Sequence, residues 1–160
     1  MADNGQKGSL MESSSTAHVL VVAHKTAATP ALLDAIRQRA ARGPARFHLL
    51  VPNPAHAGWR PSEATHPNVT EGEQILALAL PLIEETVGGP AHGSVSTRHD
   101  PMDAIEEALH DGNFDEIILS TLPRSVSRWL HIDLPHRVAH LGLPLTTVIA
   151  EGQRVPADVA

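Results

Sequence analysis

Two arginines and two serines lie close together in the segment "STLPRSVSRWLHI", residues 120–132. They are Arg124, Ser125, Ser127 and Arg128. Guanidinium groups form paired hydrogen bonds with phosphates and carboxylates, and serine hydroxyls can donate to the same oxygens. These residue types and their spacing predict a loop that binds a small anion. The alternative is a solvated surface loop whose arginines pair with acidic neighbours.

Polar residues also follow the first strongly apolar run of the chain, residues 19–23. In a parallel sheet the carboxyl ends of neighbouring strands meet at one edge, and ligands bind there. We therefore predict an anion site where this run and the apolar run at 117–119 end. Its predicted residues are His24, Lys25, Thr26, Ser120, Thr121, Arg124, Ser125, Ser127 and Arg128. For His24, a histidine whose hydrogen bonds are satisfied within the turn is favoured over a catalytic base.

Strand and helix patterns alternate along the chain and show which elements must position these residues. The predicted strands are 18–24, 46–52, 94–99, 115–121 and 143–150, and the predicted helices are 29–43, 71–89, 100–112 and 134–142. Thr29 and Asp100 are expected to cap helices because each precedes a proline, and Asp133 is expected to cap the last helix. This alternation predicts an α/β domain with a parallel sheet and helices on both faces.

The chain of 160 residues has the length of one domain. We expect a disordered segment at 1–16, a folded domain at 17–151 and a flexible tail at 152–160. Residues 53–70 carry three prolines without periodicity and predict a long loop.

Composition excludes several classes of function. The formal net charge of −6 argues against a nucleic-acid-binding surface, and the absence of cysteine removes disulfides and thiolate sites. No apolar stretch reaches the roughly 20 residues of a membrane span, and the first residues do not form a secretory signal, so we expect a cytoplasmic protein.

Nothing in the sequence requires catalysis or a metal. The chain lacks a Gly-x-Gly-x-x-Gly fingerprint, a phosphate-binding P-loop and a Gly-x-Ser-x-Gly elbow, so no catalytic residue is assigned. His136 and His140 share one helix face near His131, but the apolar stripe of that helix places them on its outer face. We expect no native metal site. Trp129 is interpreted as a lid residue or a dimer contact, with stacking on a base as a further alternative.

The runs "VLVVAHKT", "DEIILST" and "GLPLTTVIA", with the element order and length, resemble the universal stress protein family over residues 17–151. Within the family, the chain most resembles the divergent small members that are common in actinobacteria. It implies a single-domain three-layer α/β/α sandwich, Rossmann-like and similar to the adenine-nucleotide alpha-hydrolases, with a five-stranded parallel sheet of order 3-2-1-4-5. It also implies dimerisation through the last strand and, in many members, binding of ATP or AMP.

The sequence departs from the family pattern at the nucleotide site. His24 stands where the family has an acidic residue, and residues 120–132 contain no glycine where the family has a glycine-rich loop. Asp133 and Leu134 stand about where a Gly-Ser pair would fall. Without glycine, backbone amides approach phosphates less easily. The resemblance therefore implies the fold, whereas ATP binding does not transfer residue by residue.

The leading hypothesis is a non-catalytic, stress-related sensor or interaction domain that binds a small anionic ligand, such as an adenine nucleotide or phosphate. Its expected partner is a second copy, bound through the last strand and the region of Trp129. One alternative is a dimeric interaction module without a ligand. Another is a hydrolase of phosphate esters or nucleotides in which Arg124 and Arg128 stabilise phosphate charge.

Overall fold

A computed structural model describes residues 16–52, 71–98 and 100–150. The predicted loop at 53–70, the predicted tail at 152–160 and nearly all of the predicted N-terminal segment lie outside the described residues. In chain order the elements are β1 (Ala17–Val22), α2 (Pro30–Ala41), β2 (Ala45–Val51), α3 (Glu71–Val87), β3 (His92–Val95), α4 (Pro101–Asp111), β4 (Glu116–Thr121), α5 (Arg128–His131), α6 (Leu134–Ala139) and β5 (Leu145–Ile149). Within this part of the chain, no helix combines the length and apolarity needed to cross a bilayer.

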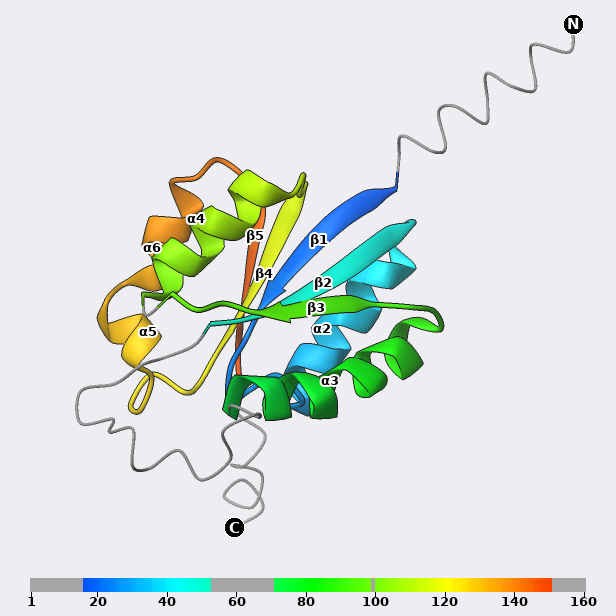
Figure 1. Cartoon of the computed structure of the whole chain (residues 1–160), viewed down its shortest axis with the longest axis horizontal. Coiled ribbons are helices and arrows are strands. Elements are labelled where there is room, and N and C mark those ends of the chain that lie inside the picture. The colour runs from blue at the N-terminus through cyan, green and yellow to red at the C-terminus, as the bar shows by residue number, and fades with distance from the viewer. Residues whose placement is uncertain (1–15, 53–70, 99, 151–160) are drawn as a thin grey trace, which may run out of the picture.

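The five strands form one parallel sheet of order β3-β2-β1-β4-β5, which confirms the predicted fold. Helices α2 and α3 cover one face, and α4 and α6 cover the other (Figure 1). The chain runs outward from β1 to β3, then crosses back to β4. The strand order therefore reverses between β1 and β4, the position where α/β sheets bind ligands.

Strand β1 is buried on both faces, as its uninterrupted apolar run predicts. Val19 and Val21 pack into the core under α2 and α3, whereas Leu20 and Val22 pack into the core under α4 and α6. All four side chains are fully buried. This central strand thus connects both halves of the core and fixes the position of the polar residues that follow it.

Two helices begin at the predicted caps. The Thr29 hydroxyl accepts a hydrogen bond from the Leu32 N–H (3.4 Å), and the Asp100 carboxylate accepts one from the Met102 N–H (2.8 Å). A proline occupies the first helical position after each cap, where its missing N–H costs no helical hydrogen bond. Both cap predictions are confirmed.

The third strand lies at His92–Val95, so the predicted position, 94–99, was wrong at both ends. Pairing with β2 sets these bounds, because His92 lies opposite His48 and Val95 opposite Val51. Gly93 allows α3 to approach closely: a Cβ atom there would lie 2.5 Å from a Leu76 methyl group. Periodicity in the sequence carries no information about such a contact between segments.

The segment before the last helix also differs from expectation. A short helix, α5, begins at Ser127, whose hydroxyl accepts a hydrogen bond from the Leu130 N–H (3.0 Å). Asp133 precedes α6 but adopts a left-handed conformation (φ 59°), and its side chain makes no capping hydrogen bond. The predicted Asp133 cap is therefore wrong, because the tight turn from α5 into α6 determines the backbone conformation at that residue.

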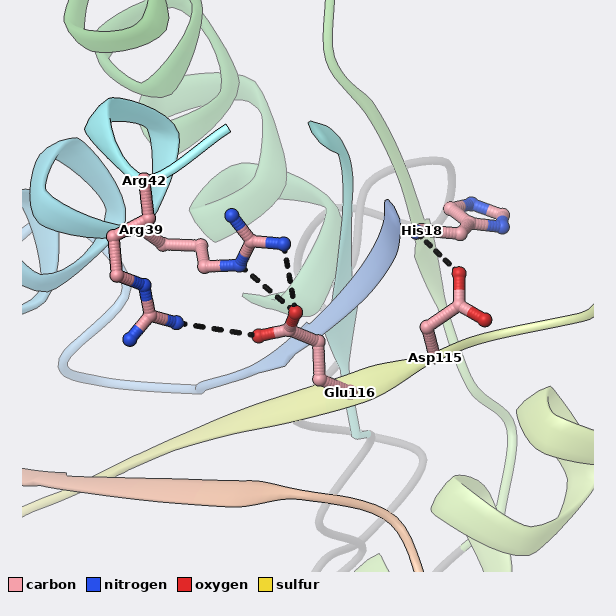
Figure 2. Close-up of polar contacts among 5 residues, drawn as sticks. All are labelled: His18, Arg39, Arg42, Asp115 and Glu116. Atoms are coloured by element: carbon pink, nitrogen blue, oxygen red, sulfur yellow. Dashed lines mark hydrogen bonds and ion pairs between the residues drawn. The ribbon is translucent and has the colours of Figure 1, made fainter. Parts of the chain in front are cut away.

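Charged contacts fix the amino-terminal edge of the sheet (Figure 2). The Glu116 carboxylate contacts the Arg39 guanidinium through two nitrogens, each at 2.8 Å, and Arg42 at 3.8 Å. One residue earlier, the Asp115 carboxylate accepts a hydrogen bond from the His18 N–H (2.8 Å). These contacts join β4 to α2 and to β1 at the edge opposite the strands' carboxyl ends.

Candidate functional site

A cavity of about 400 Å³ lies beyond the carboxyl ends of β1 and β4, where the strand order reverses. Its volume falls within the 300–1,000 Å³ that is typical of small-molecule sites. Residues from helices α3, α4 and α5, from the end of β4 and from the loops after β1, β2 and β4 line it: His24, Lys25, Thr26, Pro52, Glu71, Pro101, Ser120, Thr121, Leu122, Val126, Ser127, Arg128 and Trp129.

The fold brings together seven of the nine predicted site residues. These are His24, Lys25, Thr26, Ser120, Thr121, Ser127 and Arg128. The other two, Arg124 and Ser125, lie on the exposed loop before α5 and do not line the cavity. The sequence therefore predicted segments that the structure brings to one cavity, but it could not show which arginine of the loop lines that cavity.

Buried hydroxyl groups form part of the cavity wall. The Thr26 and Ser120 hydroxyl oxygens lie 2.6 Å apart and share one hydrogen bond, which links the β1–α2 loop to the end of β4. One hydroxyl proton of this pair remains available for a further acceptor. Ser127 accepts from Leu130 and keeps its own proton, whereas the Thr121 hydroxyl donates to the Leu122 carbonyl (3.1 Å). The wall can thus donate hydrogen bonds without losing those that hold its loops.

Two cationic side chains line the same cavity. Lys25 follows β1 and Arg128 begins α5, and both are exposed. Neither forms an ion pair with any residue in the described ranges, and the same holds for Arg124. Pairing of the loop arginines with acidic neighbours is therefore not observed within those ranges. The cations remain available to an anion.

His24 differs from its predicted state. The side chain is 92% buried, since only 8% of its surface is exposed, and its Nε2 atom has no hydrogen-bond partner among the described residues. The prediction that the hydrogen bonds of His24 are satisfied within the turn is therefore wrong for Nε2. Burial lowers the pKa of His24 below its usual value of 6.5; the Glu71 carboxylate opposes this and the Lys25 ammonium adds to it. Burial therefore favours the neutral imidazole.

Sequence reasoning missed Glu71, and it named Trp129 without including it among the predicted site residues. Glu71 begins α3, and helix amino termini lie at the same sheet edge as the strands' carboxyl ends, so its predicted helix start was a usable signal. Trp129 is half-buried, packs against the core under α4 and α6, and also lines the cavity. Its side chain therefore contributes an aromatic surface to the site, as the stacking and lid interpretations require.

His136 lies in α6, and His140 is the residue that ends this helix. The His136 and His140 rings are exposed and lie 4.5 Å apart between centroids. Over residues 16–52, 71–98 and 100–150, no three histidine or acidic side chains are grouped so that they could bind a metal ion.

The lowered pKa values of two histidines predict that the fold loses stability in mild acid. Burial lowers the pKa of His24 and of His48, and neighbouring His92 and His18 lower that of His48 further. The unfolded chain therefore binds protons first as the pH falls. The free energy of unfolding should be highest above pH 6.5 and decrease below it. Urea unfolding at pH 7.5, 6.5 and 5.5 measures this; a His24→Gln/His48→Gln variant should lose less, and an equal loss would contradict the assignment.

No protein-family model and no curated protein matches the sequence. Solved structures do match. A universal stress protein from Archaeoglobus fulgidus superposes with a TM-score of 0.59 at 12% identity, covering 87% of this chain and 98% of its own. A Burkholderia pseudomallei protein of the same family gives 0.57 at 18% identity, covering 84% and 96%. The chain has the universal stress protein fold.

A second Archaeoglobus fulgidus structure, of the universal stress protein in complex with dAMP, superposes with a TM-score of 0.52 at 14% identity. It covers 83% of this chain and 97% of its own. At these identities the likeness establishes the fold alone, and it confirms the sheet order and layers that the sequence resemblance implied. The candidate site of this universal-stress-protein-like domain must be argued from its own residues.

Proposed function

We propose that this universal-stress-protein-like domain is a non-catalytic sensor that binds a small anionic ligand in the cavity beyond β1 and β4. The observation that carries the proposal is the pair of cations, Lys25 and Arg128, without ion-pair partners in the described ranges, beside buried hydroxyl groups. Cations and hydroxyl donors that converge on one cavity bind phosphate or carboxylate.

Within this class, a nucleoside monophosphate fits better than free phosphate. The Glu71 carboxylate repels a bare anion but accepts hydrogen bonds from ribose hydroxyls or a base amino group. Trp129 and Val126 add an apolar wall on which a base can stack. The dAMP in the Archaeoglobus fulgidus neighbour supports an adenine nucleotide as the ligand to test first.

The backbone of the segment after β4 favours a ligand with a single phosphate group over a triphosphate. No glycine occurs between residues 120 and 132, and α5 has only four residues, so few backbone amides can surround a phosphate chain. AMP or dAMP should therefore bind more tightly than ATP.

The mechanism we propose makes and breaks no bond. Ligand contacts to the loop after β1 and to α5 stabilise one arrangement of these segments, and a ligand shifts the population of states only by its preference for one of them. A cytoplasmic dimer, formed through β5 and the region of Trp129, would pass this change to a second copy.

A thermal-shift panel of AMP, dAMP, ATP, phosphate and sulfate tests the proposal. A ligand at 100 times its dissociation constant stabilises by about 2.7 kcal/mol, a shift of about 5–10 °C for a chain of this size. The Lys25→Ala/Arg128→Ala variant should lose most of the shift, whereas Arg124→Ala, outside the cavity, should keep it. Equal shifts in all three proteins would contradict the site.

A ligand-free interaction module is the second candidate, favoured by the open edge of the sheet. β5 is an edge strand, and Thr146, Thr147 and Ile149 are exposed along it. Unpaired backbone groups on such an edge can pair with a second copy. Unchanged melting temperatures with every ligand of the panel, together with a dimer in solution, would support this candidate over the sensor.

A further inference from the structure

The buried imidazole of His24 is not used by the function proposed above. We infer that His24 couples anion binding in this cavity to the uptake of one proton, so that the site binds anions most tightly in mild acid. The inference rests on the proposed function, since it concerns the same cavity and the same ligand class. It adds a regulatory input, because the response of the sensor would depend on pH.

The geometry supplies the first argument. Nε2 of His24 is buried and lacks a hydrogen-bond partner among the described residues, and His24 is one of the residues that line the cavity. Buried polar atoms in folded proteins are almost always paired, so an unpaired one in a residue that lines a cavity points to a partner supplied by the ligand. A ligand oxygen is the complementary group, because protonated Nε2 donates to it.

The surrounding charges supply the second argument. The charged groups that line the cavity with His24 are Lys25 from its own loop, Glu71 from α3 and Arg128 from α5. In the free protein, burial and Lys25 lower the pKa of His24, and Glu71 only partly opposes them. A bound anion adds negative charge in the same cavity and favours the imidazolium. The complex then binds more protons than the free protein.

Proton uptake on binding fixes the direction of the pH dependence. Because the complex holds the extra proton, lowering the pH stabilises it relative to the free protein, and affinity rises. The proton comes from solvent and adds to Nε2, and no covalent bond of the ligand changes. An opposite charge within about 4–6 Å raises a pKa by about 1–3 units, so affinity should rise about tenfold or more across the transition.

Titration calorimetry with sulfate on the full chain tests the coupling. Sulfate keeps its double charge between pH 5.5 and 8.5, whereas a phosphate monoester titrates in that range and would confuse the result. We expect sulfate to bind about tenfold more tightly at pH 5.5 than at pH 8.5. Near pH 6, the measured heat should differ between two buffers of different ionisation enthalpy by the amount for one proton taken up.

Two variants separate a ligand role from a structural one. His24→Leu removes the unpaired nitrogen, so without sulfate its melting temperature at pH 7 should equal or exceed that of the wild type. Its affinity for sulfate should no longer depend on pH, because the group that takes up the proton is gone. Sulfate should still bind, because Lys25 and Arg128 remain. Glu71→Gln should keep a dependence on pH but move it to lower pH, because the Glu71 carboxylate raises the pKa of His24. If His24→Leu proves insoluble, His24→Asn and the two-buffer measurement on the wild type test the same point.

The outcomes distinguish the two proposals. Sulfate binding to the wild type with affinity independent of pH, or a full dependence on pH in His24→Leu, would overturn the coupling and leave the anion site standing. A marked loss of stability in His24→Leu without sulfate would show that Nε2 has a structural partner and would also overturn the coupling. No sulfate binding at any pH would overturn the coupling, and the absence of any shift with AMP in the thermal-shift panel would overturn the anion site as well.

Discussion

Replacing Leu20 by alanine should lower the free energy of unfolding by about 3–4 kcal/mol. Leu20 lies in the central strand β1, is fully buried, and packs into the core beneath α4 and α6. The substitution removes transfer free energy and leaves a cavity that neighbouring strands and helices cannot fill. Urea unfolding followed by circular dichroism measures the change as a lower midpoint with an unchanged slope.

Leu78→Ala is the matched control because Leu78 is 65% exposed on α3. We expect this variant to change the free energy of unfolding by no more than about 0.5 kcal/mol. Equal losses in the two leucine variants would contradict the arrangement of the core, and therefore the position of β1 that places His24, Lys25 and Thr26 at the cavity.

Glu116→Gln should cost about 2 kcal/mol of stability. The carboxylate contacts Arg39 twice at 2.8 Å and lies 3.8 Å from Arg42, and the Glu116 and Arg39 side chains are only 17% and 12% exposed. An amide is neutral, so the largely buried guanidinium of Arg39 loses its counter-charge, which costs more than loss of a surface pair. Chemical unfolding at low and moderate salt measures the difference.

Asp34→Asn provides the comparison. Its partner Arg37 is an arginine of α2, as Arg39 is, but the Asp34–Arg37 pair lies on the surface. Exposed pairs contribute about 0–1 kcal/mol and weaken with salt. If Asp34→Asn destabilised the protein as much as Glu116→Gln does, the Glu116 contacts would not be the main link between α2 and β4.

The sheet could be predicted because the sequence features that indicate it are local. The apolar run of β1, the caps Thr29 and Asp100, and the alternation of strand and helix each depend on residues close together in the chain. The family resemblance then implied the strand order, which the structure has.

The missed features depend on contacts between distant segments. β3 begins at His92 because of its pairing with β2 and the close approach of α3 at Gly93. His24 lacks a partner at Nε2 because no described side chain from α3 or the β4–α5 loop reaches that atom. Sequence patterns predicted which segments lie around the cavity, but only the packed fold shows that Arg128 lines it and Arg124 does not.

A nitrogen-15 NMR titration of the wild type with AMP tests the central claim, an anion site beyond β1 and β4, most directly. Trp129 is one of two tryptophans in the chain, so its indole signal is easily assigned by substitution. We predict that this signal and the amides of Thr26 and Ser127 shift with AMP, while Gly43 and Gly89, near the opposite edge of the sheet, do not. Unchanged spectra at millimolar AMP, or shifts confined to the opposite edge, would contradict the claim.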